Sequence, residues 1–126
     1  MTAWKNIIEA VDPFLHKVAS RLASQTQQFE PEIASFAQYV LNAQGKQLRP
    51  LLVSLSGQST GELNDSHTTA AVIIEMVHLA TLVHDDINDE AKLRRGHPTA
   101  ASKWGNELTV LLGDCLFARA VELASS

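Results

Sequence analysis

Residues 70–83, AAVIIEMVHLATLV, decide the fold expected for this chain. Apolar side chains occupy nearly every position, so a helix formed by this stretch is apolar almost all round and belongs in the core of a domain. Glu75 and His78 interrupt the apolar run, which is also too short to cross a bilayer. The stretch therefore predicts a buried central helix, and no transmembrane segment is expected.

Helical spacing of apolar residues continues on both sides of this stretch. Asp65 or Ser66 can cap the central helix, which is expected over residues 67–90. Alternation typical of a half-buried strand is not found, so the expected fold class is all-α. The other expected elements are a helix over 4–24 that Pro13 interrupts or restarts, a helix from 31 to near Gly45, a helix over 51–56 closed by Gly57, a basic loop over 92–99, and a helix from about 107 onward.

The composition is that of a soluble globular domain. Of the 126 residues, 45% are hydrophobic, which suffices for one domain with its own core. The net charge of -4 offers no general attraction for a nucleic acid, so any anion site must be local. Cys115 is the single cysteine, which excludes an internal disulfide and fits a reducing compartment, and residues 1–10 lack the pattern of a secretory signal. We therefore expect a cytoplasmic protein without a nucleic-acid partner.

An acidic cluster lies at the end of the predicted central helix. Because successive residues of an α-helix advance by about 100°, His78, Asp85 and Asp89 fall within roughly 40° of one another, and Asp86 lies beside them. Carboxylates this close repel one another, and the C-terminal end of a helix disfavours negative charge. The cluster can be a solvated helix end, or it can hold Mg²⁺, which takes one or two carboxylates together with substrate phosphates. The preceding apolar run and the following basic loop favour the metal.

Two basic segments could supply a phosphate site. Lys46 and Arg49 lie in GKQLRP, a turn that leads into a helix start, where free N–H groups favour an anion. Arg94 and Arg95 add two forked donors that match phosphate oxygens. Each pair alone is more often surface charge, and His78 alone is as often a core histidine. Together with the acids, these cations describe a surface suited to two separate diphosphates.

Three motifs follow one another along the chain: GKQLRP at 45–50, HLATLVHDDIND at 78–89 and RRGHPT at 94–99. Their order and spacing closely resemble those of trans-polyprenyl diphosphate synthases, and the later Gly113-Asp114 fits as well. Three linked motifs are far more specific than a single DDxxD. The resemblance covers the chain from about residue 40 onward. It implies an all-α antiparallel helix bundle of the isoprenoid synthase type, usually dimeric, of which this chain holds only the N-terminal helices.

The resemblance also implies roles for individual residues. Asp85, Asp86 and Asp89 would be the catalytic acids, of which Asp85 and Asp89 bind Mg²⁺ and thereby an allylic diphosphate. Arg94 would contact that same diphosphate, and His84 receives no role. The implied activity is a prenyltransferase that condenses isopentenyl diphosphate head-to-tail with the allylic diphosphate. The residues implied to hold isopentenyl diphosphate are Lys46, Arg49, His78 and Arg95.

Product length is expected to depend on residues one turn before the acids. Thr81 lies on nearly the same helix face as Asp85, and Ala80 is its neighbour. In enzymes of this family, bulky residues near these positions cap the pocket for the growing tail. The small residues Ala80 and Thr81 therefore imply a long-chain enzyme.

Members of the family are much longer and carry a second aspartate-rich motif, for which this chain has no counterpart. After Glu107 the only acids are Asp114 and Glu122. Residues 1–126 are therefore expected to be the N-terminal part of a single all-helical polyprenyl synthase domain, with the C-terminal half absent. We expect this chain to be inactive or nearly so by itself, and to form a homodimer or otherwise self-associate through exposed apolar helix faces.

Other functions fit parts of the pattern. A terpene cyclase also ionises an allylic diphosphate with DDxxD, but it has no need of Lys46, Arg49 and His78 for a second diphosphate. A non-catalytic partner subunit of a polyprenyl synthase would not need every motif of the first half. An ordinary helical module with a solvated acidic helix end would need none of them. The linked motifs favour the synthase.

Overall fold

The computed structural model describes residues 2–42 and 48–125, without the side chains of Thr2, Trp4, Ile8 and Asn42. The fold is all-α, as predicted, apart from one small hairpin. The elements in chain order are α1 (Thr2–Thr26), α2 (Pro31–Asn42), α3 (Leu48–Thr60), α4 (Asp65–Asn88), β1 (Leu93–Arg94), β2 (His97–Pro98), α5 (Ala100–Trp104) and α6 (Asn106–Ser125).

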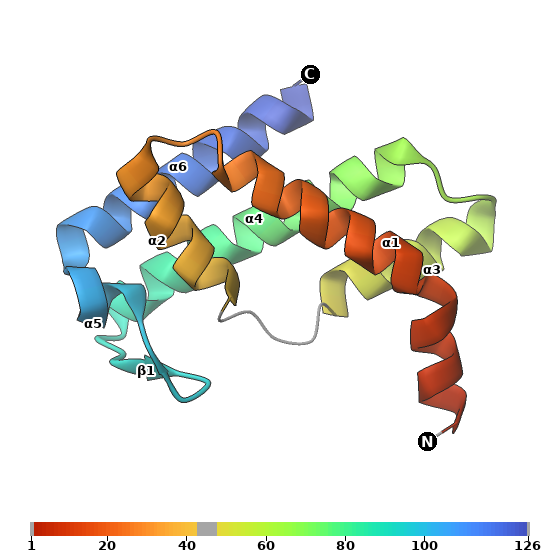
Figure 1. Ribbon diagram of the computed structural model, residues 1–126, viewed down its shortest axis with the longest axis horizontal. Coiled ribbons are helices and arrows are strands. Elements are labelled where there is room, and N and C mark those ends of the chain that lie inside the picture. Colours follow the sequence, from red (N-terminus) through yellow and green to blue (C-terminus); the bar gives the residue numbers. More distant parts are fainter. Residues whose placement is uncertain (1, 43–47, 126) are drawn as a thin grey trace.

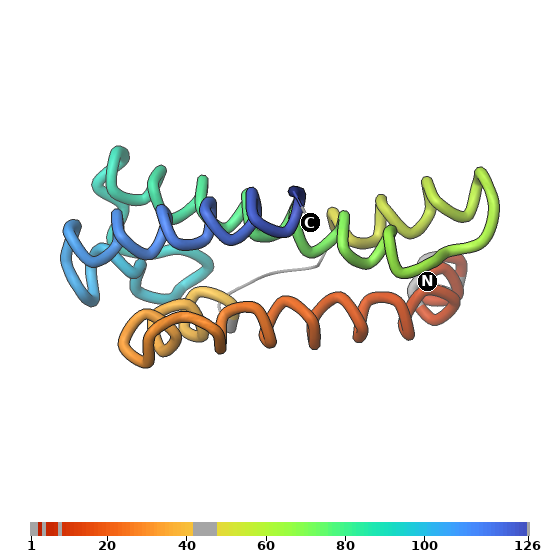
Figure 2. Tube along the Cα trace, turned by 90° about the horizontal axis from the view of Figure 1, so that it is seen from above, coloured from red at the N-terminus to blue at the C-terminus, as the bar shows by residue number. Residues whose placement is uncertain are grey.

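The predicted central helix is α4, which runs through the middle of the molecule (Figure 1). Figure 2 shows two layers: α1 and α2 form one, and α3, α4 and α6 form the other. Helix α4 packs most extensively against α6 and also contacts α1 and α3. The apolar run predicted this buried side of α4 correctly, but Ile74 and Val77 are exposed, so the helix is not buried all round. The buried apolar residues of α4 are Ala71, Val72, Met76, Leu79, Ala80 and Val83.

Helix α4 begins at Asp65, two residues earlier than the sequence indicated, and ends at Asn88, two residues before the predicted end. Its N-cap is Asn64, and not Asp65 or Ser66, because the Asn64 side chain accepts a hydrogen bond from Ser66 N at 2.9 Å while its own N–H donates to His67 Nδ1 at 3.0 Å. This reciprocal pair is a capping box. Asp65 instead accepts a hydrogen bond from Arg21 Nη2 at 2.6 Å, which joins α4 to α1 and lowers the pKa of Asp65.

Two residues expected to break helices lie inside them. Pro13 is within α1, and the N-terminal part of that helix is turned relative to the rest (Figure 1), as expected where proline removes a backbone hydrogen bond. Gly57 is within α3, where a Cβ atom would lie 2.7 Å from both His67 Cδ2 and Leu63 Cδ2. Gly57 therefore allows close packing and does not end the helix. The predicted stop at Gly45 lies outside the described residues.

The segment predicted as a basic loop contains the antiparallel hairpin β1–β2, in which Arg94 lies opposite His97. The two residues between the strands, Arg95 and Gly96, have φ values of 52° and 80°, the left-handed conformation of a tight hairpin turn. Two-residue strands are too short to show alternation, so the sequence pattern missed them. It also missed the short helix α5, which Thr99 caps by accepting a hydrogen bond from Ser102 N at 3.1 Å.

Within the described part of the chain, α4 is the one helix long and apolar enough to cross a membrane by length and composition. Core helices of soluble proteins meet the same criterion, and α4 is the core helix of this fold. The match is weak support for a membrane span.

Candidate functional site

The acidic cluster at the end of α4 divides into two exposed acids and one buried acid. Asp85 is exposed in the last turn of α4, and Asp89 is exposed as its C-cap, one residue beyond the helix. Asp86 points inward and is 6% exposed. Among residues 2–42 and 48–125, the carboxylates of Asp85 and Asp89 have no hydrogen bond or salt bridge. Their oxygens therefore face solvent, where a cation can reach them.

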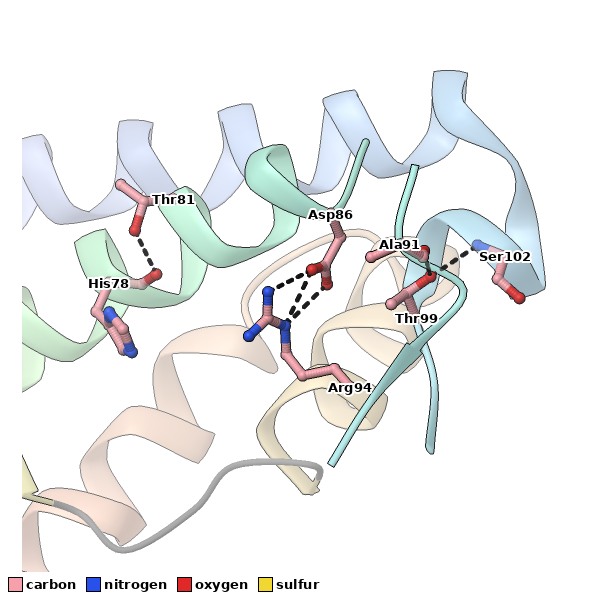
Figure 3. A network of polar contacts seen from close by, with 7 residues as sticks. All are labelled: His78, Thr81, Asp86, Ala91, Arg94, Thr99 and Ser102. Atoms are coloured by element: carbon pink, nitrogen blue, oxygen red, sulfur yellow. Dashed lines mark hydrogen bonds and ion pairs between the residues drawn. The ribbon is translucent and has the colours of Figure 1, made fainter. Parts of the chain in front are cut away.

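Asp86 pairs with Arg94 of the hairpin (Figure 3). The Arg94 Nε atom lies 3.0 and 3.2 Å from the two carboxylate oxygens of Asp86, and Nη2 lies 2.5 Å from Oδ1. These hydrogen bonds, together with the charges of Asp86, Asp85 and Asp89, raise the pKa of Arg94. The pair fixes the guanidinium beside the exposed acids. Nη1 makes no hydrogen bond within the described residues, so it can serve a ligand.

A set of contacts holds the hairpin against the helices. Thr99 Oγ1 donates to Ala91 O at 2.8 Å and accepts from Ser102 N, as Figure 3 shows. Tyr39 of α2 donates its hydroxyl to Pro98 O at 2.7 Å. The Tyr39 ring packs edge-on against Trp104, with 4.9 Å between the centroids. Thr99 belongs to the RRGHPT motif, whereas Tyr39 and Trp104 lie outside the three motifs, and together these residues position the strands that carry Arg94.

The predicted phosphate-contacting cations come from three elements and gather near His78. Arg49 is the second residue of α3, His78 is on α4, and Arg94 and Arg95 belong to the hairpin. Burial, followed by the charges of Arg49, Arg94 and Arg95, lowers the pKa of His78. The imidazole is therefore neutral near pH 7 and can donate one N–H to an anion. Lys46, also predicted for this site, lies outside the described residues.

Glu75 is a second acid that the helix directs inward. Its side chain is 2% exposed, and its Oε1 atom lies 4.0 Å from Arg49 Nη1. In the sequence Glu75 was only an interruption of the apolar run. Its spacing of three residues from His78, which places both on one side of a helix, is the signal that could have drawn attention to it.

The two residues predicted to control product length lie in different environments. Ala80 is fully buried in the core. Thr81 is exposed, and its hydroxyl donates to His78 O at 2.7 Å (Figure 3). Ile74 and Val77 are exposed apolar residues that extend the face of Thr81 toward the start of α4. This face, Ile74-Val77-Thr81-Asp85, connects the exposed acid with an open apolar surface.

His84, for which the sequence analysis found no role, joins α4 to α6 beside the acidic cluster. Its ring lies against Gly113, where a Cβ atom would approach His84 Nε2 to 2.2 Å. The same nitrogen lies 3.4 Å from Val110 O and 3.6 Å from Asp114 Oδ1. The Phe117 ring packs against His84 in a tilted arrangement, with 5.8 Å between the centroids. Gly113 is thus required by close approach of a side chain.

Gly113→Ala is expected to lower the free energy of unfolding by about 1–3 kcal/mol, because the added methyl group overpacks the contact with His84. Helix propensity alone favours alanine over glycine by about 1 kcal/mol, so it predicts the opposite sign. Urea unfolding measures the difference. The double variant His84→Ala/Gly113→Ala is the control, and it should be destabilised by less than the sum of the two single variants. A stabilised Gly113→Ala protein would contradict the packing argument.

The exposed acids match the coordination chemistry of magnesium. In the described residues, no three His, Cys, Asp or Glu side chains lie close enough together to hold a metal ion. Asp85 and Asp89 offer two hard oxygen ligands four residues apart at the helix end. Mg²⁺ keeps several waters and is commonly bound by one or two carboxylates together with phosphates. The donor set therefore fits a magnesium ion whose remaining ligands come from water and substrate.

Comparison with known proteins gives concordant matches in sequence and in structure. Residues 30–126 match the polyprenyl synthetase family model. An all-trans-nonaprenyl-diphosphate synthase (geranyl-diphosphate specific) of Rhodobacter capsulatus is 43% identical over 116 residues, covering 90% of this chain and 33% of that protein. Octaprenyl diphosphate synthase of Haemophilus influenzae is 35% identical over 119 residues, covering 94% of this chain and 36% of that protein.

Two crystal structures show the same helix arrangement. A decaprenyl diphosphate synthase from Rhodobacter capsulatus superimposes with a TM-score of 0.89 at 34% identity, covering 96% of this chain and 38% of that one. A polyprenyl synthase from Caulobacter crescentus, complexed with calcium and isoprenyl diphosphate, gives a TM-score of 0.86 at 36% identity and covers 96% and 37%. The chain thus spans about a third of the length of these relatives.

Proposed function

The chain belongs to the polyprenyl synthetase family, and on that premise we propose that its site serves the head-to-tail condensation of isopentenyl diphosphate with an allylic diphosphate to give a trans-polyprenyl diphosphate. The observation that carries this proposal is the grouping of Arg49, Arg94 and Arg95 near His78, which lies on the helix whose last turn carries the exposed Asp85. The names of the relatives, which make octaprenyl and nonaprenyl products, support a long-chain product.

The acidic end of α4 would receive the allylic diphosphate. Asp85 and Asp89 would hold Mg²⁺, which supplies positive charge that stabilises the departing diphosphate. Arg94 would direct its free Nη1 toward the same diphosphate while Asp86 holds the rest of the guanidinium in place. Because this arginine is oriented before the ligand arrives, little reorganisation accompanies the loss of the leaving group.

The other arginines near His78 would bind isopentenyl diphosphate. Arg49 and Arg95 would supply charge, and the neutral His78 would donate a hydrogen bond. The isopentenyl double bond would then attack the allylic cation, and loss of a proton would complete the condensation. The apolar face Ile74-Val77-Thr81 beside Asp85 would exclude water from the cation and accommodate the tail.

The 126 residues alone would lack catalytic activity. Asp85 and Asp89 would make one side of a metal clamp, and among the described residues no group of three His, Cys, Asp or Glu side chains could hold the ion. Exposed apolar residues on α6 favour self-association, which we propose as a homodimer of a cytoplasmic protein. These residues are Leu108, Val110, Leu111 and Val121. A terpene cyclase would leave Arg49 and His78 without a ligand, and a non-catalytic subunit would not require the exposed acids.

We expect Mg²⁺ with inorganic diphosphate to raise the thermal midpoint of the chain by roughly 5 °C at saturating ligand, because the pair binds only the folded state. Differential scanning fluorimetry measures the midpoint, with Mg²⁺ alone and diphosphate with a chelator as controls. Isopentenyl diphosphate should also raise the midpoint without metal, which separates a synthase from a cyclase. No prenyl transfer should be detectable. A midpoint unmoved by any of these ligands would contradict the proposed site.

A further inference from the structure

Glu75 is a charged side chain at a position where the core would accommodate an apolar one. The preceding and following residues of α4 that face the core are apolar, and Met76 and Leu79 are among the largest fully buried side chains. Removing a carboxylate from water is costly unless a cation and hydrogen bonds compensate. The side chain of Glu75 is 2% exposed. A buried carboxylate at this position is therefore expected to have a role that offsets the cost of its burial.

Within the described residues, the guanidinium of Arg49 forms a salt bridge with this carboxylate. Glu75 Oε1 lies 4.0 Å from Arg49 Nη1, and the Arg49 side chain is 42% exposed, so its outer part faces solvent. One nitrogen of the fork therefore faces the buried acid, and the rest of the fork is accessible to a ligand. His78 follows Glu75 by three residues on the same side of α4. Glu75 thus lies beneath the two residues expected to meet isopentenyl diphosphate.

We propose that Glu75 is a positioning residue, which orients the Arg49 guanidinium toward a bound diphosphate. This inference rests on the proposed diphosphate site at Arg49 and His78. Arginine is long and rotamer-rich, and fixing such a side chain on binding costs conformational entropy. A buried carboxylate that holds one nitrogen of the fork removes part of this cost before the ligand arrives. The Asp86–Arg94 pair does the same for the neighbouring arginine, with a directly hydrogen-bonded geometry.

The direction in which one substitution changes the affinity for diphosphate distinguishes an orienting role of Glu75 from a purely electrostatic one. Glu75→Gln keeps the shape of the side chain and removes its negative charge. If Glu75 acted only through its charge, the variant would bind a diphosphate more tightly, since a like charge near the anion has gone. If Glu75 orients Arg49, the variant binds more weakly, since the arginine must be ordered by the ligand.

Titration calorimetry with inorganic diphosphate measures this difference. Glu75→Gln is expected to weaken binding about 3- to 10-fold. Arg49→Ala should weaken it at least as much, and Glu75→Gln/Arg49→Ala should bind no more weakly than Arg49→Ala alone, because the effect of Glu75 acts through Arg49. Thr68→Val is the matched control, since it removes another buried polar group from α4 and should leave the affinity unchanged.

A second measurement separates this inference from the proposed function. The Nε–Hε signal of Arg49 in the free chain reports the order of that side chain by NMR relaxation, and Glu75→Gln should make it more mobile. If the wild-type chain binds no diphosphate, the proposed function fails, and the Arg49 signal still decides the orienting role. Tighter or equal binding by Glu75→Gln, or an Arg49 signal unaltered by it, would overturn the inference. Should Glu75→Gln not fold, Glu75→Asp, which withdraws the carboxylate by one methylene, is expected to give the same loss.

Discussion

Replacing Asp85 and Asp89 together by asparagine is expected to weaken Mg²⁺-dependent diphosphate binding by about 100-fold or more. Loss of residues that merely support metal ligands already costs about 10- to 100-fold in metal affinity, so loss of both proposed ligands should cost at least the upper part of that range. The two side chains are exposed and have no hydrogen bond or salt bridge within the described residues. Asparagine keeps their size and removes the charge that a hard cation needs.

The same double variant should leave the fold intact or make it slightly more stable. Asp85 and Asp89 repel each other across one helical turn, at the end of α4 where the helix dipole disfavours negative charge. Calorimetry with Mg²⁺ and inorganic diphosphate measures the affinity, and urea unfolding measures the stability. Glu107→Gln, which neutralises another exposed acid in a different helix, is the control for the affinity and should leave it unchanged. A double variant that retains Mg²⁺-dependent binding would show that the metal lies elsewhere.

Simple helix geometry predicted much of this site. The apolar run of residues 70–83 correctly indicated a buried central helix, because both its length and its composition favour a core helix over a strand. It also placed Asp85 and Asp89 on one face. Asp86 is rotated by about 100° from Asp85 on an α-helix, so its different environment was implicit in the spacing. Its pairing with Arg94 was not, because that contact depends on the fold of the hairpin.

Contacts between distant segments account for what the sequence pattern missed. Gly57 is a helix breaker by propensity, but the approach of His67 and Leu63 makes it a packing residue inside α3. The hairpin depends on left-handed φ values at Arg95 and Gly96 and on the hydrogen bond from Tyr39 to Pro98, which joins residues 59 apart in sequence. A hydrophobic pattern predicts neither the left-handed φ values nor the hydrogen bond. The burial of Glu75 beneath Arg49 likewise requires α3 to lie against α4.

Substitutions at Ala80 and Thr81 are expected to have very different effects on stability, because Ala80 faces the core and the adjacent Thr81 faces solvent. Ala80 is fully buried, so Ala80→Phe forces a ring into a filled space and is expected to cost about 3 kcal/mol or more in the free energy of unfolding. Thr81→Phe should cost about 1 kcal/mol at most, because the residue is exposed and loses only its hydrogen bond to His78 O. Urea unfolding of the two variants measures this contrast.

The two substitutions should also differ in their effect on product length. The Thr81 side chain lies between Asp85 and the exposed Val77, so a phenylalanine there would obstruct a tail that grows along this face of α4 away from the acids. In an active synthase that carries residues 30–126 of this chain, Thr81→Phe is expected to shorten the products, measured by chromatography. Thr81→Val, which removes the hydroxyl at nearly constant size, is the control and should leave the length unchanged. Because Ala80 faces the core, Ala80→Phe should lower the amount of folded enzyme. The expectation would be contradicted if Ala80→Phe shortened the products and Thr81→Phe left them unchanged. That result would place the growing tail on the other side of α4.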